Sequence, residues 1–224
     1  MCTEPAAATT TKMISLHTLS LLQWLSPAFP TGAFACSGGL ETAIADERIR
    51  TTADLQAWLR HLLCHGPLWS DAVLLAQGLK PGADHDALDT LARALCLSAE
   101  RLEETLSLGT AFARTVSAAT SRSLPPRTLP IAIAEAAAPL GLPAETVVAH
   151  SLHAALSNLV TIATRAVPLG QTEGQTLLTA LHPLIPGTAA RATGAGLSGL
   201  GTAAFAADLA SLSHETLQPR LYRT

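Results

Sequence analysis

Apolar side chains recur along this chain every three or four residues, the spacing that places them on one face of an α-helix. The clearest example lies in residues 51–65. Thr51 or Thr52 can cap the start of this helix, and the Gly66-Pro67 pair ends it. The apolar positions that share its face are Leu55, Trp58, Leu59, Leu62 and Leu63.

The same spacing, interrupted by segments rich in proline and glycine, predicts helices along nearly the whole chain. These helices cover residues 13–26, 40–49, 51–65, 68–79, 87–97, 99–117, 131–138, 144–165, 172–182 and 188–210. No run of alternating β-branched residues appears, so we expect no sheet. The pattern predicts an all-α fold, a single-domain bundle of about 8–10 helices over residues 13–212. Residues 1–12 form a flexible N-terminal tail in this interpretation, and residues 213–224 form a polar C-terminal tail.

The chain has few charged residues, and this low content bears on the kinds of partner that it can bind. Charged residues make up 14% of the sequence and the net charge is −3, whereas a typical soluble domain has about 25% charged residues. Helix faces with so little charge favour close helix packing and suggest that a protein partner covers part of the surface. No basic cluster appears, so nucleic acid and anionic membrane are not expected partners.

The first forty residues and the cysteines bear on the cellular location. Residues 13–40 carry no charge, but prolines and glycines interrupt them too often for a membrane-spanning helix. The polar start of the chain lacks the features of a secretory signal. The cysteines have no CxxC spacing and fit reduced thiols, so we expect a cytoplasmic protein. They are Cys2, Cys36, Cys64 and Cys96.

The glycine-rich stretch "PTGAFACSGGLE" at 30–41 admits three interpretations. It could be a phosphate-binding loop, a metal site around Cys36, or a bend between two helices. A phosphate-binding loop needs a preceding strand and a following lysine, and both are missing. The same lack of a strand argues against nucleotide binding by "GAGLSGLG" at 194–201. A bend whose glycines allow close backbone approach is the interpretation that remains.

Histidine and cysteine pairs provide the other candidates for chemistry. His61, Cys64 and His65 could share a helix face and bind a metal, but Leu62 stands where a metalloprotease motif needs glutamate. A half-exposed helix edge is the plainer explanation, as it is for His150 and His153. No local motif for a catalytic triad appears, although triads are assembled in space and the sequence alone does not exclude one. We expect no enzymatic activity and no cofactor.

Four stretches, in order and with matching spacing, resemble the UreF family of urease accessory proteins. They are "PTGAFACSGGLE" (30–41), "HGPLWSDAVLLAQ" (65–77), "VPLGQTEGQTLL" (167–178) and "HETLQPRLYRT" (214–224). The resemblance implies an all-helical homodimer without activity of its own. Such proteins bind UreD, also called UreH, and recruit the GTPase UreG, and the assembly helps to insert nickel into apo-urease.

The resemblance also implies a site. The C-terminal tail is expected to become ordered when UreD binds and to pack near the glycine-rich bend, forming the surface that recruits UreG. The partner-binding residues carried over by position are Phe34, Ser37, Gly39, Glu41, Arg220, Leu221, Tyr222 and Arg223.

Three positions depart from the family pattern. Phe34 stands where relatives can have tyrosine, Cys36 where histidine is frequent, and Thr224 where the family ends in serine. Because Phe34 has no hydroxyl, we expect the tail to contact the bend by a cation–π interaction or through the backbone.

Two further roles stay open. The protein could regulate the GTPase by supplying an arginine to its transition state, and Arg220, Arg223 and Arg114 are the candidates. It could also conduct nickel directly, through Cys36 or through the His61, Cys64 and His65 group.

Overall fold

The computed structural model describes residues 15–167 and 169–224, and this part of the chain is helical with no strand, so the predicted all-α fold is confirmed. The first helices along the chain are α1 (Leu16–Trp24), α2 (Leu40–Ala45), α3 (Thr52–His65), α4 (Pro67–Gly78), α5 (His85–Ala94) and α6 (Ala99–Thr120). They are followed by α7 (Leu129–Ala137), α8 (Ala144–Ala166), α9 (Gln171–Leu181), α10 (Leu184–Gly194) and α11 (Phe205–His214). Short 3-10 turns lie at Ala33–Ala35, Ala138–Leu140 and Leu197–Gly199.

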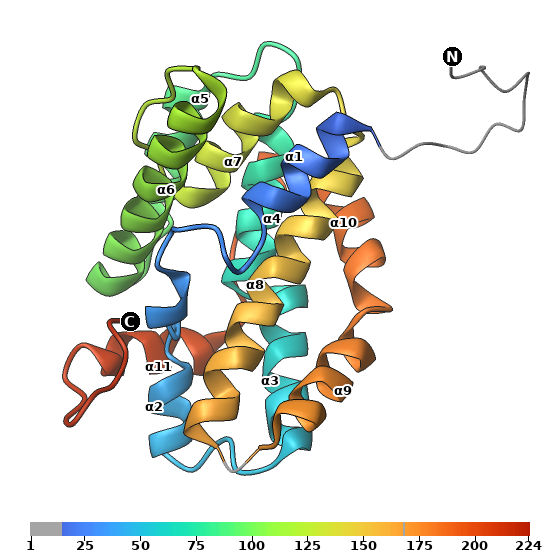
Figure 1. The fold of residues 1–224 in the computed structure, drawn as a ribbon. Coiled ribbons are helices and arrows are strands. Elements are labelled where there is room, and N and C mark those ends of the chain that lie inside the picture. Colours follow the sequence, from blue (N-terminus) through green and yellow to red (C-terminus); the bar gives the residue numbers. More distant parts are fainter. Residues whose placement is uncertain (1–14, 168) are drawn as a thin grey trace, which may run out of the picture.

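Helix α8 is the central element of the bundle. In Figure 1 it runs the length of the molecule beside α3 and α4, and it also packs on α9 and α10. The apolar face that the sequence predicts for it is buried, as the spacing requires. That face consists of Val148, Leu152, Leu156, Leu159 and Ala163. By length and apolar composition alone, α8 is the one helix in the described residues that could also cross a membrane, but these positions pack into the core.

Helix α3 begins and ends where its sequence signals lie. The Thr51 hydroxyl accepts a hydrogen bond from the Asp54 amide, and the Asp54 carboxylate accepts one from the Thr51 amide, which is a complete capping box. Gly66 ends the helix, and Pro67 occupies the first position of α4, where its missing N–H costs nothing. The predicted apolar face of α3 is buried at Leu55, Leu59, Leu62 and Leu63, while Trp58 is partly buried.

The predicted helix over 188–210 is wrong, because the structure divides it between α10 and α11. Glycine lowers helix propensity throughout 194–201, and side chains of α4 bind the carbonyl groups that are left without helical partners. Trp69 Nε1 donates to the Gly199 carbonyl at 2.9 Å, and Gln77 Nε2 donates to the Ala195 carbonyl at 2.6 Å. The connection is therefore fastened to the core, and α11 turns away to pack on α2.

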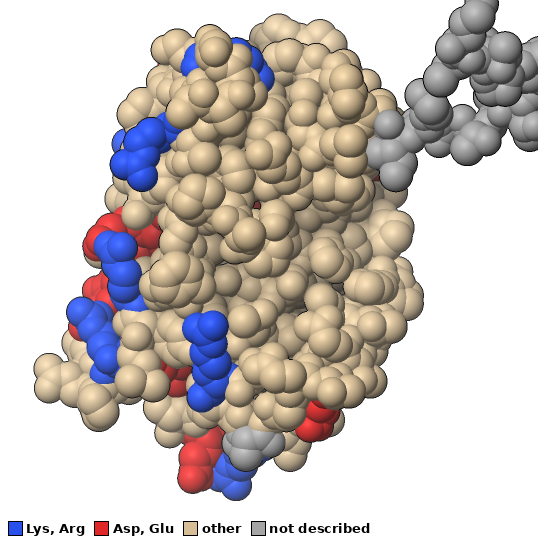
Figure 2. Space-filling view, in the orientation of Figure 1, with Lys and Arg blue, Asp and Glu red and all other residues tan. Residues whose placement is uncertain are grey.

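The C-terminal tail and α11 lie at one edge of the molecule, next to α2 and to the first turns of α6 (Figure 1). Charged side chains gather along this edge, whereas the upper and central part of the face that carries α1 and α8 shows few of them (Figure 2). The segments that the sequence marked as unusual, 30–41 and 213–224, thus meet where the charge is concentrated.

Candidate functional site

The glycine-rich bend is held against α11 and α8. Gly39 has a positive φ of 82°, and a Cβ placed there would lie 2.7 Å from the backbone nitrogen of Ser211. Any other residue would be strained and would collide with α11, so glycine is required on both counts. From the other side, Asn158 of α8 donates to the Ala33 carbonyl at 2.9 Å. The bend therefore has one fixed shape, which it presents to the tail.

Glu41, in the first turn of α2, is the main acceptor for the tail. Its carboxylate accepts hydrogen bonds from the Leu221 amide at 2.7 Å, from the Tyr222 amide at 3.1 Å and from His214 Nε2 at 3.0 Å. Burial alone would raise the pKa of Glu41, but these three hydrogen bonds outweigh it and hold the pKa below its ordinary value. An ionised carboxylate with this many donors is a strong anchor for two consecutive backbone groups.

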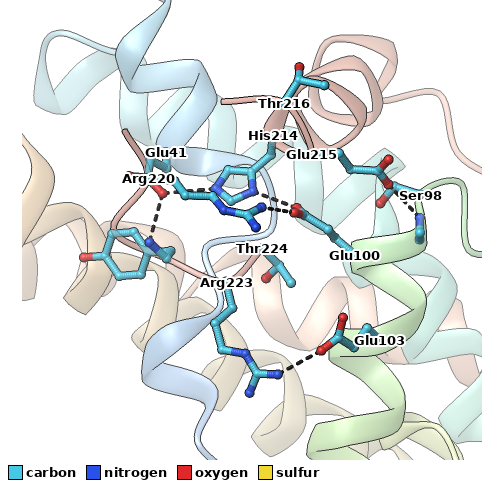
Figure 3. A network of polar contacts seen from close by, with 12 residues as sticks. Glu41, Ser98, Glu100, Glu103, His214, Glu215, Thr216, Arg220, Arg223 and Thr224 are labelled. Carbon is cyan, nitrogen blue, oxygen red and sulfur yellow. Dashed lines mark hydrogen bonds and ion pairs between the residues drawn. The ribbon is translucent and has the colours of Figure 1, made fainter. Parts of the chain in front are cut away.

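His214 and Glu100 continue the network on the other side of Glu41. His214, the last residue of α11, is fully buried, and its Nδ1 lies 2.7 Å from the Glu100 carboxylate of α6. The other oxygen of Glu100 pairs with the guanidinium of Arg220. Figure 3 shows the imidazole between the two carboxylates, with the Arg220 side chain alongside. The network thus joins α2, α6, α11 and the tail.

Backbone hydrogen bonds join the bend directly to the end of the tail. The Ser37 amide donates to the Thr224 carbonyl at 2.7 Å, and the Arg223 amide donates to the Ala35 carbonyl at 2.8 Å. The Ser37 hydroxyl, which is fully buried, donates to the same Thr224 carbonyl. Because Phe34 has no hydroxyl, we expected the tail to contact the bend by a cation–π interaction or through the backbone. The structure shows the backbone contact. In the described residues the cation–π contact is elsewhere, with Arg191 over the ring of Trp69.

Glutamates in the first turns of α6 bind side chains of the tail. Arg220 pairs with Glu100, Arg223 pairs with Glu103 at 2.8 Å, and the Thr224 hydroxyl donates to Glu104 at 3.1 Å. The acceptor residues Glu100, Glu103 and Glu104 all come from the stretch "AERLEE". Sequence reasoning missed these glutamates and His214. A signal was present, because the three carboxylates share a helix face at i, i+3 and i+4 while two arginines stand close together in the tail.

Beneath the tail, Arg101 forms a partly buried ion pair with Asp71 of α4 and with Glu104 at 3.4 Å. Burial opposes the charge on Arg101, but the two carboxylates outweigh it and raise the pKa of the guanidinium. Burial, together with the carboxylate of Glu104, raises the pKa of the Cys36 thiol to about 11. Cys36 is therefore a protonated, buried thiol between the bend and α6, which is neither a nucleophile nor a ready soft ligand.

The docked tail leaves several predicted partner-binding residues on the surface. Leu221 is 82% exposed and Phe34 is 63% exposed, and the side chain of Arg223 is 61% exposed. Tyr222 instead turns inward, where its hydroxyl donates to the Ile162 carbonyl of α8 at 3.4 Å. The predicted residues thus divide into anchors that hold the tail and side chains that face solvent. The anchors are Ser37, Gly39, Glu41 and Tyr222, together with Arg220, which pairs with Glu100.

The candidate metal ligands lie in two separate places. His61 and His65 stand on α3 with ring centroids 5.4 Å apart, and His61 Nε2 lies 3.3 Å from the Ala203 carbonyl. Cys64 lies on the same helix, whereas Cys36 belongs to the bend. Across residues 15–167 and 169–224, no group of three or more His, Cys, Asp or Glu side chains is arranged to hold a metal ion.

Comparison with known proteins identifies the family. The UreF family model matches residues 49–182. A urease accessory protein UreF of Cereibacter sphaeroides (strain ATCC 17029 / ATH 2.4.9) is 54% identical over 211 residues, which is 94% of this chain and the full length of that relative. The protein of the same name from Paracoccus denitrificans (strain Pd 1222) is 47% identical over 206 residues, 92% of this chain and 95% of the relative. The all-helical chain with its bend and C-terminal tail therefore belongs to the UreF family of urease accessory proteins.

Proposed function

We propose that this protein is a non-enzymatic scaffold in urease maturation. In this proposal it works in the cytoplasm with UreD (UreH) and recruits the GTPase UreG, so that nickel is inserted into apo-urease. Membership of a family named for an accessory role in urease production supports the general assignment. The particular partners follow from the resemblance of the bend and the tail to those of the family.

The observation that carries the proposal is the surface that the bend and the tail form together. Two backbone hydrogen bonds and the carboxylate of Glu41 hold the tail on the bend. Around these contacts, Phe34, Leu221 and Arg223 remain exposed. Exposed aromatic, aliphatic and arginine side chains on a rigid support are the chemistry of interaction hot spots. A surface of this kind serves to bind a protein, and nothing in it requires a reaction.

The composition of the tail supports an ordering step on partner binding. Residues 215–221 are exposed except for the half-buried Leu217, and the tail is held mainly by hydrogen bonds and ion pairs. Ion pairs of half-exposed side chains contribute only about 0–1 kcal/mol each. We therefore infer that UreD shifts the tail toward the docked form by covering it, and that UreG then binds the completed surface.

A co-purification experiment tests this role. Tagged full-length protein is compared with a variant that ends at His214 and with the double variant Leu221→Ala/Arg223→Ala, each mixed with UreD and UreG. We expect both variants to lose UreG. Arg60→Ala, an exposed arginine on α3, is the matched control and should retain it. Recruitment of UreG by the truncated chain at the full-length level would overturn the role of the tail.

Regulation of the GTPase is a second candidate role, and one feature of α6 favours it. Glu103 and Arg114 lie on the same open surface of α6, and Glu103 is also the partner of Arg223. Two of the candidate arginines thus lie along one surface that begins at the tail. Single-turnover GTP hydrolysis by UreG, with UreD and with wild-type, Arg114→Ala or Arg223→Ala protein, decides the matter. An unchanged rate with the wild-type protein would eliminate this role.

We also propose that the protein forms a homodimer. Leu16, Leu19 and Leu22 project from α1 and are 78%, 50% and 44% exposed. Helix α1 lies on the face of the molecule that shows few charged side chains (Figures 1 and 2). An exposed apolar stripe surrounded by so little charge fits the core of a subunit interface.

A further inference from the structure

His214 has a hydrogen-bonding arrangement that constrains its protonation. Nδ1 lies 2.7 Å from one oxygen of Glu100, and Nε2 lies 3.0 Å from one oxygen of Glu41. An ionised carboxylate can only accept hydrogen bonds, so each ring nitrogen has to donate. Only the imidazolium form carries a proton on both nitrogens. Either neutral tautomer would place a nitrogen lone pair against a carboxylate oxygen, in a site with no access to water.

The charges around His214 balance when it is protonated. The groups that face it are the carboxylate of Glu41 from α2 and the carboxylate of Glu100 from α6, and Arg220 from the tail pairs with the second of these. Two negative and two positive charges then form one closed cluster (Figure 3). If His214 loses its proton, two carboxylates that are about nine-tenths buried share a single cation, and a buried charge without a partner is strongly destabilising.

The same two carboxylates bind the tail. Glu41 accepts the amides of Leu221 and Tyr222, and Glu100 accepts the guanidinium of Arg220. In the structure His214 is still part of α11, and its ring makes no hydrogen bond to residues 215–224, the part of the tail that follows the helix. Its action on the tail is therefore indirect, through the position and the charge of its two acceptors.

We propose that His214 is a positioning residue that, as an imidazolium, holds Glu41 and Glu100 in the arrangement that binds the tail, so that loss of its proton releases the tail. Docking of the tail then depends on pH, and the tail is released as the pH rises. This statement concerns the chain alone. Its consequence for recruitment of UreG rests on the proposed function.

The first test is the protonation state of His214 in the wild-type full-length protein. Side-chain nitrogen NMR of ¹⁵N-histidine-labelled protein distinguishes an imidazolium, with a proton on both nitrogens, from the two neutral tautomers. At pH 7 we expect the His214 signal to be that of the doubly protonated ring. A neutral tautomer at this pH would overturn the proposal, whatever the effect of any substitution.

The second test follows the tail itself. Tyr222 is the only tyrosine in the sequence, so ¹³C-labelled tyrosine gives one ring signal that reports whether the tail is docked. In the wild-type protein we expect this signal to move from the docked to the free position as His214 loses its proton. A Tyr222 signal that stays docked after His214 has lost its proton would overturn the proposal.

Two variants separate positioning from general stability. In His214→Gln, which has no charge and donates from one atom only, we expect the Leu221 and Tyr222 amides to exchange with solvent at least about tenfold faster at pH 7. The pH transition of Tyr222 should also disappear. His182→Gln, an exposed histidine between α9 and α10, should leave both readouts unchanged. If His214→Gln keeps a docked tail and wild-type exchange, the proposal fails.

Co-purification of UreG at the same pH values separates this proposal from the proposed function. If the tail is released as predicted and UreG still binds, the recruiting role of the tail is wrong while the role of His214 stands. If the tail stays docked throughout, the role of His214 is wrong, and the truncation experiment still decides the function.

Discussion

Among single residues, Glu41 has the largest share in holding the candidate site together. Its two oxygens serve the imidazole of His214 and two amides of the tail, so one side chain connects three segments that are far apart in sequence. The sequence indicated Glu41 only through the resemblance to the UreF family. Its role could not be read from the residues alone, because its partners lie more than 170 positions away.

Replacing Glu41 by glutamine should lower the stability of the folded protein. Glutamine has the same shape, but it loses the charge and turns an amide NH₂ toward one of the present donors. We expect Glu41→Gln to lower the free energy of unfolding by about 1.5–3 kcal/mol at pH 7, the usual value of hydrogen bonds to a charged group. Urea denaturation measures the change. Glu47→Gln removes an exposed ion pair with Arg50 and is expected to cost about 0–1 kcal/mol. Equal effects of the two substitutions would contradict the anchoring role.

The lowered pKa of Glu41 also sets a direction for the effect of pH. Because the pKa in the folded protein lies below the ordinary value of 4.5, the stabilisation is complete above that value. It is lost as the pH falls through the folded pKa. The difference in unfolding free energy between wild type and Glu41→Gln should therefore be constant from pH 7 to about 5.5 and shrink below pH 4.5. A difference in unfolding free energy that grows on acidification would show that folding does not lower the pKa of Glu41.

Cys36 should be unreactive in the folded protein. A rise of its pKa from 9.0 to about 11 reduces the thiolate fraction at pH 8 by about one hundredfold, and the thiolate is the species that reacts with iodoacetamide. We expect native Cys36 to be alkylated at least about one hundredfold more slowly than Cys36 in the urea-unfolded chain, as measured by mass spectrometry of its peptide. Equal rates in the two states would mean that the bend does not bury this thiol.

At the scale of elements, the apolar spacing predicted most helices because they are local. The stripe of α3 and the stripe of α8 are buried as expected. The helix over 188–210 was wrong for a reason that is not local. Its middle is held out of helical geometry by Trp69 and Gln77, which are more than 115 positions away. The acceptors of the tail on α6 were missed for a related reason: their spacing marks a carboxylate face on the helix, but the arginines that bind it lie 120 positions away.

The cap of α3 offers a test of a local signal. The Thr51 hydroxyl accepts the Asp54 amide at 3.2 Å, and without that oxygen the amide has no partner in the first turn. Thr51→Ala should lower the free energy of unfolding by about 1 kcal/mol. Thr51→Ser retains the hydroxyl and is the matched control, expected to lose much less. Urea denaturation of both variants checks this, and a cost that is the same for alanine and serine would assign the effect to the methyl group and not to the cap.

At the scale of the whole molecule, charge and apolar surface are separated. Ion pairs gather where the tail meets α6, while the face that carries α1 is poor in charge (Figure 2). The sequence predicted an apolar stripe on this first helix, but it could not show which part faces outward. In the structure, Leu21 and Trp24 enter the core, and the remaining leucines are left on the surface.

If the leucines of α1 form the subunit interface, a charge placed among them should separate the subunits. We expect the wild-type protein to have twice the chain mass of 23.1 kDa in light scattering after size exclusion, and Leu19→Arg to have the mass of one chain. An unpaired charge in the apolar centre of an interface costs several kcal/mol, enough to dissociate a moderately stable dimer. Leu209→Arg changes an equally exposed leucine on α11 and is the matched control. Dissociation by Leu209→Arg but not by Leu19→Arg would move the interface to α11, and a monomeric wild-type protein would exclude the homodimer.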